Sequence, residues 1–228
     1  MRDMTTGVDD AASRPPARRT ASRRAYEWIR DAILNGDYAE GEFIDEVALA
    51  EQVGTSRTPV REALQRLQVE RFVDLLPRRG AQVRVVTATE MREIYQARYV
   101  LEAEALRTIC RERTDPGIEE SMLNELERLG AAGEWNRFAQ LDQAFHSAIV
   151  RAQGNAVMSD MYDSLRPRQV RLGTRTLVEQ PGRLDTIHRE HRELLAAIAR
   201  HDAEASVEIT ARHLRVIPEL VSAFSHDA

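Results

Sequence analysis

Apolar residues recur at helical spacing along most of the chain, and clusters of turn-forming residues divide it into two parts. In the first part, short helical patterns are followed by two runs of strand-forming residues on either side of a turn. We expect helices at residues 21–36, 45–53 and 57–70, and strands near residues 72–76 and 82–86. Three helices followed by a β-hairpin predict a winged helix-turn-helix domain over residues 21–86.

The second part, residues 87–228, has only helical periodicity. Thr87 and Glu90 have the spacing of a capping box, which predicts the start of its first helix. The expected helices span residues 88–112, 117–130, 134–153, 155–173, 183–201 and 203–224. Short connections favour antiparallel packing of neighbouring helices. The predicted fold is therefore mostly α, with the winged helix-turn-helix domain followed by an all-helical antiparallel bundle for effector binding and dimerisation.

Residues 1–20 lack periodicity and are expected to form a disordered arm, whose arginines either touch phosphates or remain solvated. No apolar run approaches the roughly 18 residues of a membrane span. The single cysteine, Cys110, excludes an internal disulfide, and no secretory signal is evident. These features predict a cytoplasmic protein that makes no membrane contact.

The charge distribution favours a nucleic-acid partner only weakly. The net charge is −5, and all 32 basic residues are arginine. Residues 14–86 carry 13 arginines against 11 acidic residues, whereas residues 87–228 carry 18 against 23. The small basic excess therefore lies in the part that is expected to bind DNA.

The second and third expected helices, joined by a tight turn, have the proportions of a helix-turn-helix unit. Arg57, Thr58 and Arg61 lie at the start of the third helix, where such helices contact base edges. An arginine guanidinium can hold O6 and N7 of one guanine together. Ser56 and Thr58 place hydroxyls at a helix N-terminus, where phosphates bind, and Gly80 allows a close approach of the wing backbone to DNA.

Several segments of this region together resemble the winged-helix domain of the GntR superfamily of transcription regulators. They are residues 41–44, 49–51, 56–64, 66–67 and 79–80, and the run from Ser56 to Leu64 is highly specific. Two positions depart from the family pattern. Thr55 stands where a small aliphatic residue is common, and Arg71 stands where a glycine usually ends the recognition helix. The resemblance implies binding to double-stranded operator DNA.

Four potential metal ligands lie on or beside apolar stripes of three expected helices. Asp142 and His146 are four residues apart and project from one face of a helix, and His191 and His213 lie on later helices. Such side chains are costly on an apolar stripe unless they have a partner. Any one of these histidines alone is more often a satisfied core or surface residue than a ligand. Together, three imidazoles and one carboxylate suit a divalent ion, Zn²⁺ first and Ni²⁺ or Mn²⁺ as alternatives.

The segments Asp142-x-x-x-His146, Gly154-Asn155, Glu190-His191 and His213-Leu214 resemble the metal-binding FCD domain, the all-helical effector domain of the FadR subfamily of GntR regulators. Together with the winged-helix segments, the resemblance covers residues 22–224. It implies that the four residues above are the metal ligands. It also implies a homodimer that acts on near-palindromic operators and responds to a carboxylate metabolite.

Arg98 is a further polar residue on an apolar stripe, in helix 88–112. Glu102, four residues later, offers a structural ion pair. The alternative is that Arg98 points into the bundle and holds a carboxylate with two hydrogen bonds, which the family resemblance favours. His188, one turn from His191, is either an effector-contacting or ligand-supporting group or a helix-surface residue.

The sequence thus predicts a ligand-responsive transcription regulator, a repressor, that senses a small organic acid at a metal-containing pocket. One alternative is a metal sensor, in which the ion itself is the signal. A second alternative, a zinc hydrolase, is disfavoured because four protein ligands leave less room for an activated water. We also find no general base beside the four residues, and a hydrolase has no need of the segment from Ser56 to Leu64.

Overall fold

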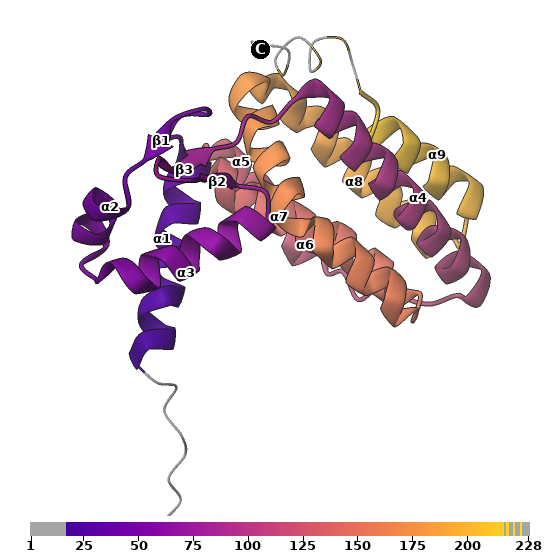
Figure 1. Cartoon of the computed structure of the whole chain (residues 1–228). Coiled ribbons are helices and arrows are strands. Elements are labelled where there is room, and N and C mark those ends of the chain that lie inside the picture. Colours follow the sequence, from indigo (N-terminus) through magenta and orange to yellow (C-terminus); the bar gives the residue numbers. More distant parts are fainter. Residues whose placement is uncertain (1–16, 217, 219–220, 222–223, 225–228) are drawn as a thin grey trace, which may run out of the picture.

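A computed structural model describes residues 17–216, 218, 221 and 224 (Figure 1). The N-terminal domain consists of α1 (Ala17–Asn35), β1 (Phe43–Ile44), α2 (Glu46–Val53), α3 (Arg57–Val69), β2 (Val73–Leu76) and β3 (Gly80–Val83). The bundle consists of α4 (Ala88–Glu112), α5 (Glu120–Ala131), α6 (Trp135–Ala152), α7 (Ala156–Glu179), the 3₁₀ turn η1 (Pro181–Arg183), α8 (Leu184–Ala199) and α9 (Ala203–His213). The mostly α fold class is confirmed.

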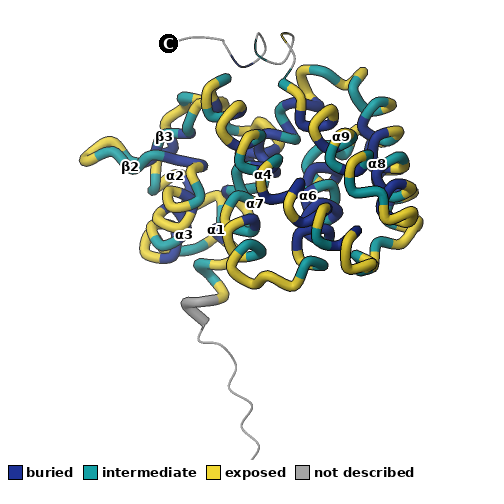
Figure 2. The backbone as a smooth tube through the Cα atoms, turned by 90° about the vertical axis from the view of Figure 1, so that its right-hand side faces the viewer, coloured by how far each residue is buried: buried dark blue, intermediate teal, exposed yellow. Residues whose placement is uncertain are grey.

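The three strands form an antiparallel sheet in the order β1-β3-β2, one strand more than the sequence predicted. β1 has only two residues, too few to show alternation, and Phe43 pairs with Gln82 in β3. The turn after β2 is exposed and projects from the rest of the domain (Figure 2). Gly80 begins β3 at a φ of +84°, and a Cβ there would lie 2.8 Å from the carbonyl oxygen of Ile44. The glycine is therefore needed for the sheet itself.

The helix-turn-helix unit has well-defined ends. The Asp45 carboxylate caps α2 by accepting hydrogen bonds from the amides of Val47 and Ala48, and Gly54 ends it in the left-handed conformation. Arg71, just beyond α3, has a φ of +65°. It therefore takes the left-handed conformation for which glycine is usual at this position, at the energetic cost of a side chain there.

The apolar core of the N-terminal domain is continuous with the bundle. Ala139 of α6 and Val170 of α7 belong to the same buried cluster as Ile29, Leu64 and Leu67. A second buried cluster, inside the bundle, includes residues from α4 through α8. Figure 2 shows buried residues along the inward sides of these helices. No helix among the described residues is long and apolar enough to cross a membrane.

Three helix boundaries differ from the expectation by four residues or more. α1 begins at Ala17, inside the segment expected to be a disordered arm, and residues 1–16 lie outside the described part. α7 continues to Glu179 instead of ending at residue 173. An added Cβ at Gly173 would lie 3.3 Å from Ala139, so this glycine permits close packing of α7 on α6. α9 ends at His213 rather than near residue 224, and Pro218 in the intervening stretch disfavours one continuous helix.

Candidate metal centre and nucleic-acid interface

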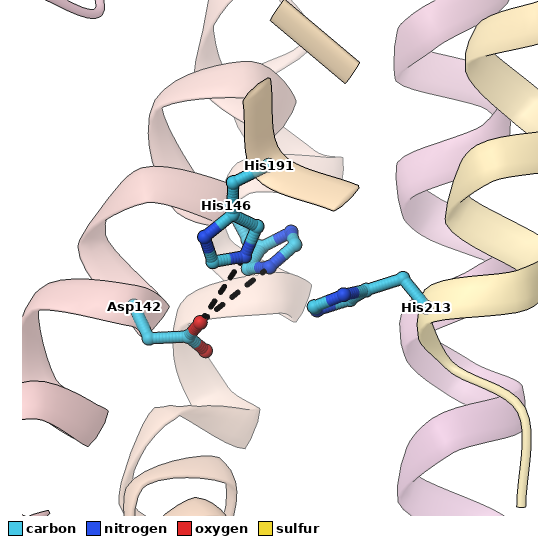
Figure 3. Close-up of side chains that lie close together, drawn as sticks. All are labelled: Asp142, His146, His191 and His213. Carbon is cyan, nitrogen blue, oxygen red and sulfur yellow. Dashed lines mark ion pairs between the residues drawn. The ribbon is translucent and has the colours of Figure 1, made fainter. Parts of the chain in front are cut away.

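The four predicted metal ligands meet inside the bundle (Figure 3). Asp142 and His146 project from α6, His191 from α8, and His213 is the last residue of α9. One ligand atom from each residue lies within 4.8 Å of the others. Asp142 Oδ1 lies 3.3 Å from His191 Nε2 and 4.0 Å from His146 Nε2. The structure thus brings together residues that are up to 71 positions apart in the sequence.

The imidazoles of this cluster are buried and short of hydrogen-bond partners. His146 and His191 are almost completely buried, and neither ring nitrogen of either residue has a hydrogen-bond partner among the described residues. The three ring centroids are 4.9 to 5.2 Å apart. Burial, and then the neighbouring His213 and His146, hold the pKa of His191 well below its usual range. A neutral imidazole such as that of His191, with an unused lone pair, suits a metal ion.

Two buried carboxylates lie behind the histidines. Glu190 Oε2 is 3.1 Å from His213 Nδ1, within hydrogen-bond distance. Glu102 Oε2 lies 2.9 Å from His146 Nδ1, in ion-pair range but without the alignment of a hydrogen bond. Both contacts engage Nδ1 and leave Nε2 available for a metal ion, which is how partners behind a ligand fix its orientation. Sequence reasoning did not assign this role to either glutamate.

Arg98 makes the ion pair with Glu102 that the sequence offered, and one of its guanidinium nitrogens has no partner among the described residues. Its Nε donates to Glu102 Oε1 at 2.9 Å, and Tyr162 donates to the same oxygen at 2.7 Å. Burial would raise the pKa of the Glu102 carboxyl, but the facing His146 and Arg98 outweigh it and lower that pKa. The Nη2 atom of Arg98 is buried without a partner among the described residues. The structural ion pair therefore leaves part of the guanidinium available for a ligand.

Arg98, Asp142 and His213 line one small cavity of about 40 Å³. Its other walls carry buried polar atoms that lack a hydrogen-bond partner among the described residues, in the side chains of Gln143, Gln169, Thr176 and Arg183. Unsatisfied buried polar groups are rare in folded proteins and mark sites of water or ligand binding. Sequence reasoning missed these residues, since single polar positions on α6 and α7 gave no pattern.

His188 is not part of this cavity. Its ring packs edge-on against Phe138, with the ring centroids 5.7 Å apart, and its Nε2 lies beside Gly130 of α5. Burial lowers the pKa of His188. The structure therefore does not bring His188 together with the other predicted effector-binding residue, Arg98.

The predicted DNA-binding residues form an exposed surface at the start of α3. Arg57 and Arg61 both face Glu46 of α2, at 3.8 and 2.6 Å, and more than half of each arginine side chain is accessible. Ser56 and Thr58 are exposed beside them, and the Ser56 hydroxyl makes no capping hydrogen bond. Glu46 thus holds both arginines at the helix N-terminus.

The wing adds two arginines that sequence reasoning did not assign to DNA binding. Arg78 and Arg79 are exposed in the turn between β2 and β3, and the Arg79 guanidinium lies 5.0 Å from the centre of the Phe43 ring. Gly80 is at the base of this turn rather than at its tip. The tip of the wing is therefore formed by residues 77–79 rather than by Gly80.

Comparison with known families agrees with this architecture. Residues 21–83 match the model of the bacterial regulatory proteins of the gntR family, and residues 93–216 match the FCD domain. The chain belongs to the GntR family of transcription regulators. In this GntR regulator, the DNA-binding domain and the metal-ligand cluster fall within the two matched regions.

One similar protein is the Nta operon transcriptional regulator of Aminobacter aminovorans, which is 31% identical over 78% of this chain and 83% of the relative. The gluconate operon transcriptional repressor of Bacillus subtilis is 31% identical over 65% of this chain and 61% of the relative. A GntR regulator from Rhodococcus sp. RHA1 has the same fold, with a TM-score of 0.71 at 24% identity, covering 86% of this chain and 94% of that one. These relatives are transcription regulators rather than enzymes, which sets the zinc-hydrolase alternative aside.

Proposed function

We propose that this GntR regulator is a repressor whose helical bundle binds a divalent metal ion together with a small organic acid. The observation that carries the proposal is the cluster of buried imidazoles that faces Asp142, whose ring nitrogens largely lack hydrogen-bond partners among the described residues. Leaving so many polar atoms unpaired in an apolar interior costs stability, and a bound ion removes that cost.

The residues present fit Zn²⁺. Three imidazole nitrogens and one carboxylate oxygen are ligands that zinc prefers, and Ni²⁺ or Mn²⁺ also accept such a set. Glu102 and Glu190 hold His146 and His213 with Nε2 available. The bound ion would supply a net positive charge, because Asp142 offsets only one of its two units.

The unpaired atoms of the cavity indicate the chemistry of the second ligand. Arg98 Nη2 offers a charged donor for a carboxylate, and guanidinium groups bind carboxylates in this way. Gln169 and Thr176 offer amide and hydroxyl groups, which suit the hydroxyls of a hydroxy acid or a sugar acid. A dicarboxylate is the other class that this pattern of donors accommodates.

The DNA-binding part of the proposal rests on the exposed arginines of α3 and of the wing. Arg57 and Arg61 would contact bases in the major groove, with Ser56 and Thr58 on phosphates. We infer a homodimer on a near-palindromic operator, as the GntR resemblance implies. The repressor assignment follows the named relative of the gluconate operon.

The test measures operator release by metal and acid separately. The operator is first selected from random double-stranded DNA with the wild-type protein. Affinity is then measured with metal-free protein, with Zn²⁺ alone, and with Zn²⁺ plus each of a panel of hydroxy acids, dicarboxylates and sugar acids. We expect one class of acid to weaken operator binding at saturating Zn²⁺.

The matched variants are His146→Ala and, as a control outside the cavity, His201→Asn. The exposed His201 has a φ of +57°, which asparagine tolerates. We expect His146→Ala to lose both Zn²⁺ binding and the acid response, and His201→Asn to retain them. Operator affinity that follows free Zn²⁺ alone, with no acid response, would identify a metal sensor and refute the organic-acid part of the proposal.

A further inference from the structure

Arg171 of α7 connects the bundle to the DNA-binding domain. Its side chain is buried, and its guanidinium donates to the main-chain oxygens of Arg71 and Arg84. Nη2 also lies 3.2 Å from the carboxylate of Glu40. One side chain therefore holds three separate segments of the N-terminal domain.

These acceptors lie at the parts of that domain that position the DNA-contacting residues. Arg71 is the left-handed residue two positions after the end of α3, the recognition helix, and Arg84 directly follows the wing strand β3. Glu40 precedes β1. Its second carboxylate oxygen accepts from Arg175, one turn further along α7, at 2.5 Å. We call the contact of Arg171 and Arg175 with Glu40 and the two main-chain oxygens the arginine clasp.

The opposite side of the same helix lines the metal cavity. Gln169, Gly173 and Thr176 are cavity walls, although they alternate in sequence with the clasp residues. Both amide atoms of Gln169 and the Thr176 hydroxyl are buried without a hydrogen-bond partner among the described residues. A single helix thus separates the unpaired cavity atoms from the contacts with the DNA-binding domain. Figure 1 shows α7 between the N-terminal domain and α4.

Two features favour movement of this part of α7 when the cavity fills. A cavity of about 40 Å³ holds a few water molecules at most, so an organic acid can enter only if a wall moves. Pro167 lies inside α7 and has no amide hydrogen, so the helical hydrogen bond to the residue 163 carbonyl is missing. The segment 168–179, which carries both the cavity wall and the clasp, is therefore joined to the first half of α7 at a weak point.

We propose that Arg171 is a positioning residue that transmits the occupancy of the metal cavity to the recognition helix and the wing. The inference rests on the proposed function of that cavity. Ligand contacts with Gln169 and Thr176 shift residues 168–179, and the clasp carries the shift to the ends of α3 and β3. A small displacement becomes a change in the placement of the DNA-binding surface, because the clasp fixes that surface on α7 at three points.

The experiment compares the coupling between cavity and operator in matched variants. For each variant, operator affinity is measured without ligand, with Zn²⁺, and with Zn²⁺ plus D-gluconate, L-malate or citrate as probes, and Zn²⁺ content is measured separately. Arg171→Met removes the clasp, and Glu40→Gln weakens it without changing α7. Arg168→Met is the control, since Arg168 makes no hydrogen bond or ion pair among the described residues.

In the wild type and in Arg168→Met, we expect at least one probe to change operator affinity about fivefold or more, within the range of measured allosteric couplings. In Arg171→Met the change should fall to about twofold or less with Zn²⁺ content retained, and Glu40→Gln should lie between. Arg171→Lys should restore part of the coupling, because it keeps the charge but not the planar fork.

The outcomes separate the two claims. A wild type that binds no Zn²⁺ overturns the proposed function and this inference with it. A wild type that binds Zn²⁺ but shows no coupling with any probe overturns the transmission and leaves the metal site standing. Wild-type coupling in both Arg171→Met and Glu40→Gln overturns the role of the clasp alone.

Discussion

Replacement of Arg98 by lysine tests how the proposed effector is held. In the structure, Nε of Arg98 is engaged by Glu102 at 2.9 Å, while Nη2 is buried in the cavity without a partner among the described residues. The planar guanidinium can serve both positions because its donors point in different directions. A lysine ammonium is a single point that serves Glu102 or the ligand, but not both in the same geometry.

The expected loss of affinity corresponds to one hydrogen bond between Arg98 and the ligand. Glu102 is almost completely buried, so we expect the ammonium of Arg98→Lys to stay with it rather than leave its charge unpaired. The ligand then loses one charge-assisted hydrogen bond, which contributes about 1.5–3 kcal/mol. At about 1.4 kcal/mol for each tenfold change, affinity for the acid should fall roughly 10- to 150-fold. Zn²⁺ content should not change.

The assay is titration calorimetry of the zinc-loaded protein with the acid that scores highest in the panel. Arg107→Lys is the matched control, because Arg107 lies on the same helix and is half exposed, with a 3.7 Å contact to Glu104. It should bind the acid like the wild type. Equal affinity in Arg98→Lys and Arg107→Lys would refute this model of the cavity and leave Arg98 with a structural role only. A neutral or cationic active ligand would refute it as well.

Three further predictions concern the rest of the chain. Arg57→Ala and Arg61→Ala should each weaken operator binding by about tenfold or more, because each loses a base contact that contributes about 1–3 kcal/mol. Unchanged affinity in both variants, with circular dichroism spectra like that of the wild type, would show that α3 is not the recognition helix. Gly80→Ala should lower the free energy of unfolding by about 1–3 kcal/mol in a denaturant titration, because alanine at positive φ would meet the oxygen of Ile44; a stability change within the error of the measurement would contradict that. Without metal, the melting temperature should be highest above about pH 6.5 and decline below it. Burial lowers the pKa of His191 in the fold, so the unfolded chain takes up protons first, and a melting temperature constant from pH 7 to pH 5 would count against this reading.

Local sequence signals predicted the helix-turn-helix unit well because its determinants lie close together in the chain. Asp45 caps α2 and Gly54 ends it, so both boundaries follow from neighbouring residues. β1 was missed because two residues carry no alternation, and its pairing with β3 connects residues about 40 positions apart. The helix expected over residues 155–173 in fact continues to Glu179, and Gly173 within it serves the packing of α7 on α6. A glycine's role depends on the neighbouring helix, which a single sequence does not specify.

The metal-ligand cluster was predictable in part for the same reason. The spacing of Asp142 and His146 places them on one helix face from geometry alone. The meeting of His191 and His213 with that face depends on how three helices are rotated against one another, and only the family resemblance pointed to it. His188 lies one turn from His191 but turns toward Phe138, which shows how a small change of angle around α8 leads to different surroundings. The contact of Glu102 with His146 and the unpaired amide of Gln169 became visible only with the packing.

The most direct test of the account is the metal content and ligand shell of the wild-type protein. Elemental analysis after purification without chelators should find about one divalent ion per chain. X-ray absorption at the zinc edge should show only nitrogen and oxygen neighbours at about 2.0–2.2 Å. Both signals should disappear in His146→Ala and persist in His201→Asn. A protein without a divalent ion that also gains no thermal stability from Zn²⁺, Ni²⁺ or Mn²⁺, or a zinc shell that contains sulfur from Cys110, would contradict the assignment of the ion to Asp142, His146, His191 and His213.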